Sequence, residues 1–92
     1  MKVHELISSP EHWCQGALHE EKTTRDGTIH AYCVIGAIKY CYDEQEGREV
    51  FQKVLSKIND NEDKHPFFLS SWNDAPERTH DEVLALCKEL DI

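Results

Sequence analysis

The sequence contains neither a long apolar run nor a cluster of basic residues, and both absences exclude classes of protein. Residues 1–6 carry charges where a signal peptide would need its apolar core. No apolar run approaches the roughly 20 residues that span a membrane. We therefore expect a soluble cytoplasmic protein without a membrane partner.

Basic charge is scarce, because 18 acidic residues stand against 10 basic ones, for a formal charge of -8 at pH 7. Lys and Arg are scattered singly from Lys2 to Lys88 and do not alternate with aromatic residues as they do in single-strand binders. Direct nucleic-acid binding is therefore not expected. An acidic surface suits a basic protein partner or imitation of nucleic acid at a basic groove, although its commonest role is solubility.

Glycine motifs and paired cysteines are also missing. The glycines are dispersed, so the sequence has no phosphate-binding loop and no dinucleotide fingerprint. The cysteines lack paired spacing, and a reducing compartment keeps them as thiols; they are Cys14, Cys33, Cys41 and Cys87. We expect no cofactor, and folding needs no disulfide.

The length and the apolar pattern predict a mainly α fold. A chain of 92 residues has room for one core, so we expect a single domain over residues 1–92, built as a bundle of about four helices. Apolar spacing predicts a short helix at residues 3–7, and Ser9 with Pro10 signals another helical turn. A central helix is expected over residues 31–42, with a buried strand at 31–38 as the alternative.

Two further helices follow from the amphipathic pattern and its start signals. One is predicted over residues 45–59, and polar residues 59–64 end it before an apolar connector at 65–69. The other begins at Thr79, which forms a capping box with Glu82. Between the first turns and the central helix, Asp26-Gly27 is a tight-turn dipeptide, so residues 14–30 form either a short β-hairpin or a flexible loop.

The most distinctive segment is residues 72–79, which is polar, aromatic and rich in turn-forming residues. Side chains of Asn73 and Asp74 are expected to hydrogen-bond to nearby backbone in a loop, and Asp74 could hold Arg78. A structural role is the preferred interpretation. The alternative is a binding site that includes Gln15, Trp72, Asn73, Asp74 and Arg78.

Cys33 is a candidate nucleophile because a thiol near a helix N-terminus becomes more acidic. His30 or His80 would be its base, and Asn73 or Asp74 would orient that base. A cysteine in the most apolar part of a chain is more often a small core residue, which is the competing interpretation.

His12, Cys14, His30 and Cys33 could form a metal site, since two pairs of soft ligands at short spacing each resemble half of a zinc site. Their spacing matches no common zinc motif, so no metal site is expected. His4, His19 and His65 are interpreted as ordinary surface or boundary residues, and the paired carboxylates of residues 20–21, 43–44 and 60–63 as solvated ones.

Three motifs occur in order along the chain: Trp13-Cys14-Gln15-Gly16, then Cys33-Val34-Ile35-Gly36-Ala37, then Trp72-Asn73-Asp74 with Arg78-Thr79 and Glu82-Val83-Leu84. Together they resemble an uncharacterised family of small bacterial and phage-borne proteins, known only as a domain of unknown function. The resemblance implies that the loop before the last helix meets the start of the central helix. The residues that would come together are Gln15, Gly16, Cys33, Gly36, Asn73, Asp74, Arg78 and Thr79.

Two functional hypotheses follow. The preferred one is a non-enzymatic interaction protein, such as a phage or mobile-element accessory factor in the host cytoplasm, that binds a basic site on a host protein. The alternative is a small thiol-dependent hydrolase or transferase that uses Cys33 with His80 or His30.

Overall fold

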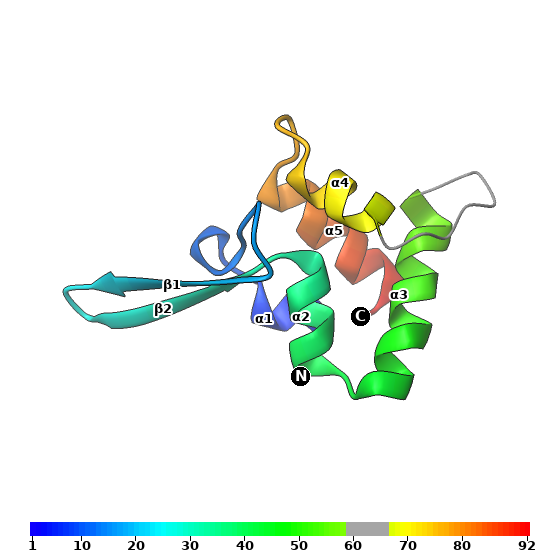
Figure 1. Ribbon diagram of the computed structural model, residues 1–92, viewed down its shortest axis with the longest axis horizontal. Helices are drawn as coiled ribbons and strands as arrows, with labels where there is room; N and C mark the ends of the chain where they lie inside the picture. The colour runs from blue at the N-terminus through cyan, green and yellow to red at the C-terminus, as the bar shows by residue number, and fades with distance from the viewer. Residues whose placement is uncertain (59–66) are drawn as a thin grey trace.

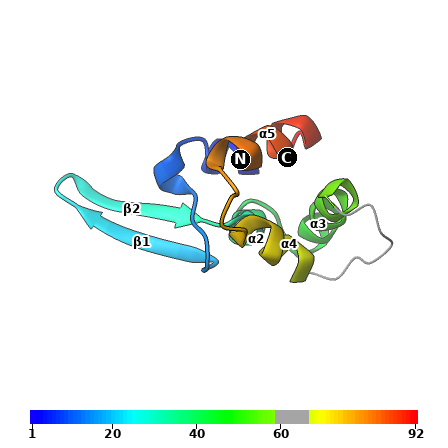
Figure 2. The same ribbon diagram turned by 90° about the horizontal axis from the view of Figure 1, so that it is seen from above.

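A computed structural model describes residues 1–58 and 67–92, and it shows a helical body with one projecting hairpin (Figure 1). Both views place the hairpin as an arm that extends away from the helices (Figures 1 and 2). The elements in chain order are α1 (Val3–Leu6), a 3₁₀ turn (Pro10–His12), β1 (His19–Thr24), β2 (Gly27–Tyr32), α2 (Val34–Cys41), α3 (Glu44–Ile58), α4 (Phe67–Asp74) and α5 (His80–Leu90).

Helix α2 lies at the centre of the body and contacts α1, α3 and α4. Its residues 34–38 are all buried, which agrees with the absence of charge in this part of the sequence. Apolar side chains from the other helices complete one core around it, among them Val3, Leu55, Leu69 and Val83. The fold is therefore mainly α with a short hairpin, as predicted, although the described residues contain five α-helices rather than about four.

The hairpin pairs β1 with β2 in antiparallel register from His19↔Tyr32 to Thr24↔Gly27. Arg25 and Asp26 form the turn, and Gly27 follows with a φ of +128°, a conformation that glycine adopts without strain. The predicted turn dipeptide thus lies one residue too late. Most hairpin side chains are exposed, and only Ala31 is buried.

The predicted central helix begins too early. Residues 31 and 32 belong to β2, and helix α2 starts at Val34 with Cys33 as its N-cap. Backbone pairing of Ala31 with Glu20 and of Tyr32 with His19 explains the difference, because the apolar pattern of residues 31–38 suits a strand as well as a helix.

Helices α3 and α5 agree closely with the sequence. The observed α3 begins one residue before the predicted start, and it is described up to Ile58, while the predicted polar break at 59–64 lies outside the described residues. Helix α5 has Thr79 as its N-cap, and the predicted capping box with Glu82 is present. The turn after Ser9 is a 3₁₀ turn with Pro10 at its first position.

The segment before α5 differs most from the prediction. Residues 72–74 form the last turn of α4 rather than a loop, and the loop is confined to residues 75–79. The apolar connector expected at 65–69 is helical from Phe67 onward, and its first two residues lie outside the described part of the chain. The side-chain partners of Asn73 explain why this turn remains helical, as described below.

No helix within residues 1–58 and 67–92 is both long enough and apolar enough to cross a membrane.

Candidate functional site

Asn73 is the one buried polar side chain among the described residues, and its amide joins three segments of the chain. Its Oδ1 accepts hydrogen bonds from the indole Nε1 of Trp13 (2.8 Å) and from the backbone amide of Val34 (3.1 Å). Its Nδ2 donates to the carbonyl of Cys14 (3.1 Å) and to the carboxylate of Asp74 (2.9 Å). All the hydrogen-bonding capacity of this amide is therefore used inside the fold.

Gln15, Gly16 and Asp74 extend the same network. The Gln15 side chain donates to the carbonyls of Asn73 (2.9 Å) and Ala75 (3.0 Å), which lie at the end of α4. The amide of Gly16 donates to the Asp74 carboxylate at 3.0 Å. The loop at residues 13–16 is thus held between the end of α4 and the start of α2. Of the residues that the resemblance brings together, Gln15 and Gly16 meet Asn73 and Asp74 here.

The suggested ion pair between Arg78 and Asp74 is not formed, and Arg78 has other partners. Its Nε donates to the carbonyl of Trp72 (2.9 Å), its Nη1 pairs with Glu82 (2.8 Å), and its guanidinium lies 4.1 Å from the centre of the Trp72 ring. These contacts fix the entry to α5. All five candidate binding residues have partners inside the protein, which favours the structural interpretation over a ligand site. They are Gln15, Trp72, Asn73, Asp74 and Arg78.

Gly36 lies where the chain before β1 approaches α2 most closely. A Cβ atom at this position would overlap the carbonyl oxygen of Leu18, the same oxygen that accepts a hydrogen bond from the Cys33 amide (3.3 Å). Only glycine allows the two backbones to approach this closely.

The Cys33 thiol caps α2 from inside the core. It is 5% exposed, and its Sγ accepts a hydrogen bond from the Gly36 amide at 3.4 Å. Burial raises the pKa of the thiol above its ordinary value and outweighs the opposite effect of that hydrogen bond. A thiolate nucleophile at Cys33 is therefore disfavoured at neutral pH.

The proposed bases for Cys33 have other partners. The Nε2 atom of His80 lies 2.6 Å from the carbonyl of Ile7, and Nδ1 of His30 lies 2.9 Å from Nε2 of His19. The four residues considered as a metal site do not form a cluster either: His12 contacts the His30 carbonyl, and the Cys14 thiol donates to the Ala17 carbonyl at 3.4 Å. Burial raises the pKa of Cys14 to about 11, which disfavours its thiolate.

An open groove lies between α2 and α3. Its volume is about 850 Å³, and the large apolar and aromatic residues among those that line it are Ile35, Ile38, Tyr42 and Phe51. Charged residues of both signs also line it, namely Lys39, Asp43, Glu44 and Arg48. Glu44 and Arg48 form an exposed ion pair at 2.7 Å, and Asp43 caps the amide of Glu46 at 2.8 Å.

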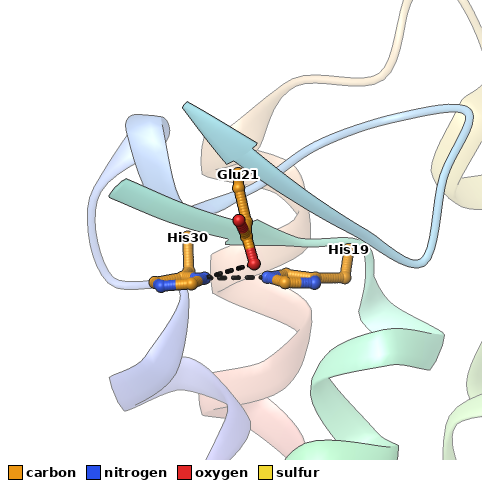
Figure 3. Close-up of side chains that lie close together, drawn as sticks. All are labelled: His19, Glu21 and His30. Carbon is orange, nitrogen blue, oxygen red and sulfur yellow. Dashed lines mark hydrogen bonds and ion pairs between the residues drawn. The ribbon is translucent and has the colours of Figure 1, made fainter. Parts of the chain in front are cut away.

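Three exposed side chains come together on the hairpin (Figure 3). His19 Nε2 lies 2.9 Å from His30 Nδ1, and the Glu21 carboxylate lies 3.9 Å from that same His30 nitrogen. Figure 3 shows the carboxylate directed toward the space between the two rings. We refer to these three residues as the hairpin triad.

Sequence reasoning placed His30 in other candidate sites and interpreted His19 and Glu21 as solvated surface residues. The sequence does contain one sign of the hairpin triad, which is the pattern His19-x-Glu21 before the turn with His30 after it. It becomes informative only when the register of the hairpin is known, because a shift of one residue would move His30 to the opposite face.

No curated protein and no solved structure matches the chain. A family profile does match, over residues 1–90, which is nearly the whole sequence. The chain therefore belongs to a protein family of unknown function, DUF6197.

Proposed function

We propose that this protein is a non-enzymatic interaction domain, and that the groove between α2 and α3 binds an amphipathic helix of a partner protein with basic flanks. The observation that carries the proposal is the apolar part of the groove's lining, which is contributed by Ile35, Ile38, Tyr42 and Phe51. Grooves between two helices commonly receive the apolar stripe of a third helix.

The dimensions of the groove fit a short helix. Helix α3, which forms one wall, has 15 residues and is therefore about 22 Å long, while α2 with 8 residues is about 12 Å long. Two turns of a partner helix, about 11 Å long, would lie along both walls, and a third turn would contact α3 alone. Gly47 lies in the wall of α3, and its missing side chain widens the groove.

Charge determines the expected flanks of the partner helix. The two acidic and two basic residues that line the groove balance one another, so contacts inside it are mainly apolar. The whole chain carries a formal charge of -8, however, and such a field accelerates association with basic partners. We therefore expect apolar residues at i, i+3 or i+4 and i+7, with Lys and Arg outside this stripe.

A displayed library of helical peptides tests this proposal. Peptides enriched on the immobilised protein should carry the apolar spacing and the basic flanks, and their association rate should fall as salt is raised. Gly47→Gln places a side chain in the groove and should weaken binding at least tenfold. Glu46→Gln is the matched control, because Glu46 is exposed on the same helix and does not line the groove.

Two results would contradict the proposal. One is enrichment of peptides without an amphipathic pattern, and the other is equal binding of the selected peptides to Gly47→Gln and to the unmodified protein. The thiol-dependent alternative is not proposed, because the Cys33 thiol is buried with a raised pKa and His80 lies against the Ile7 carbonyl. The phage or mobile-element origin stays a prediction.

A further inference from the structure

We propose that the hairpin triad, His19, Glu21 and His30, binds a divalent transition-metal ion of the zinc class. The site lies on the hairpin arm and shares no residue with the groove, so it is independent of the proposed interaction function.

The register of the hairpin places the three side chains on one face. Glu21 and His30 are directly paired across the strands, and His19 lies two residues before Glu21 on the same strand. Directly opposed residues, and residues two apart on a strand, share a face of the sheet. This face is exposed, whereas Ala31 on the opposite face is buried.

The distances between the ligand atoms fit a small ion. Zinc binds imidazole nitrogen and carboxylate oxygen at about 2.0–2.2 Å, so two ligands at tetrahedral angles lie about 3.3–3.5 Å apart. The separations of 2.9 Å between the His19 and His30 nitrogens and 3.9 Å between Glu21 and His30 bracket this value. All three ligand atoms lie within 4.8 Å of one another, so side-chain rotations alone would bring them to a common ion.

Ring contacts already orient one histidine. The His19 ring lies nearly parallel to the Tyr32 ring, with centroids 4.8 Å apart and an interplanar angle of 20°. Tyr32 in turn contacts Tyr40 of α2, with centroids 5.2 Å apart, so the His19 side chain is connected to the helical body. Because these contacts already restrict the His19 side chain, less conformational entropy is lost when this side chain binds the ion.

The donor set determines which ions are preferred. Two imidazoles and one carboxylate suit zinc, copper, nickel and cobalt, whereas magnesium and calcium prefer oxygen ligands only. The two facing nitrogens lie 2.9 Å apart, so a hydrogen bond between them requires that one ring carry its hydrogen on the facing nitrogen. To bind a metal, that ring carries its proton on the far nitrogen, so that both facing nitrogens offer a lone pair.

Three protein ligands leave the fourth tetrahedral position to water, as in zinc sites that have an open coordination position. The triad is exposed, and the hairpin is held by backbone pairing that does not require the ion. Metal binding should therefore leave the secondary structure unchanged and should be reversible with a chelator.

The experiment is calorimetric titration of the full chain with Zn²⁺ alone at pH 7.5, with Co²⁺ as a spectroscopic probe. We expect one ion per chain, a cobalt spectrum typical of nitrogen and oxygen ligands, and no heat with Mg²⁺. His30→Ala should lower the affinity by more than about 100-fold, and Glu21→Gln by about tenfold, since even outer-shell changes at metal sites have effects of this size. His4→Ala is the control that removes one histidine outside the triad.

Three outcomes would overturn the proposal. They are equal zinc affinity in His30→Ala and the unmodified protein, an equal loss of affinity in His4→Ala, and a thiolate-to-cobalt absorption band, which would assign the metal to cysteines. Circular dichroism of His30→Ala and Glu21→Gln distinguishes loss of a ligand from loss of the fold. Because neither side chain is buried, both variants should keep the native spectrum.

Discussion

Replacing Asn73 with Ala should have a larger effect on stability than any other single polar substitution in the described residues. The change leaves the Val34 amide and the Cys14 carbonyl buried without their partner, whereas the Trp13 indole is only partly buried. Each buried group left unsatisfied costs roughly 1–3 kcal/mol, and the missing amide leaves a small cavity as well. The expected loss is about 3–5 kcal/mol, a large fraction of the roughly 5–15 kcal/mol that stabilises a typical domain.

Urea denaturation measures this loss. Far-ultraviolet circular dichroism follows the helices, and fluorescence follows the two tryptophans, Trp72 beside Asn73 in the chain and Trp13, whose indole donates a hydrogen bond to Asn73. Thermal unfolding should show a midpoint lower by about 12–40 °C, since each kcal/mol shifts a domain of this size by about 4–8 °C. Gln45→Ala is the control, because it removes an exposed amide and should change stability by less than about 0.5 kcal/mol. If the two variants unfolded at the same urea concentration, the structural role assigned to Asn73 would be wrong.

Two further predictions concern backbone approach and thiol reactivity. Gly36→Ala should destabilise the protein by more than about 3 kcal/mol, because the added Cβ overlaps the Leu18 carbonyl. Gly47→Ala should instead stabilise α3 by about 0.5–1 kcal/mol, because the added Cβ has room. Comparison of the urea midpoints of the two variants checks this, and similar midpoints would refute it. Iodoacetamide should not label Cys33 in the native protein at pH 8, because the thiol is buried with a raised pKa, and peptide mapping should find label there only after unfolding; rapid native labelling would restore the enzymatic hypothesis.

Local signals were the most predictable part of the fold. The capping box of Thr79 and Glu82 depends on residues three positions apart, and it fixes the start of α5 regardless of tertiary context. The amphipathic pattern of α3 was equally reliable, because charged and apolar residues alternate with helical period over its 15 residues.

Segments whose conformation depends on distant partners were predicted less well. Asn73 commonly occurs in turns because its side chain bonds to nearby backbone, but here that side chain bonds to Trp13, Cys14 and Val34, so the local turn loses its advantage. Residues 31 and 32 were assigned to a helix because their pairing with β1 is not visible in an apolar pattern.

The candidate sites, too, were predicted less well where they depend on contacts between distant segments. The family resemblance predicted correctly that residues around Gln15, Cys33 and Asn73 meet, but their hydrogen bonds are internal, so proximity did not indicate a ligand. The hairpin triad was not found from the sequence, because its members come together only through the register of β1 and β2.

The position of Asn73 also has a consequence for how the molecule opens. Its amide joins α4, the loop at residues 13–16 and the start of α2, so none of these segments can separate without breaking hydrogen bonds in the others. In hydrogen-exchange terms, the amides of Gly16 and Val34 should share one opening event despite their separation in sequence. Residues 13–16 should therefore open together with the start of α2, although they form no helix or strand of their own.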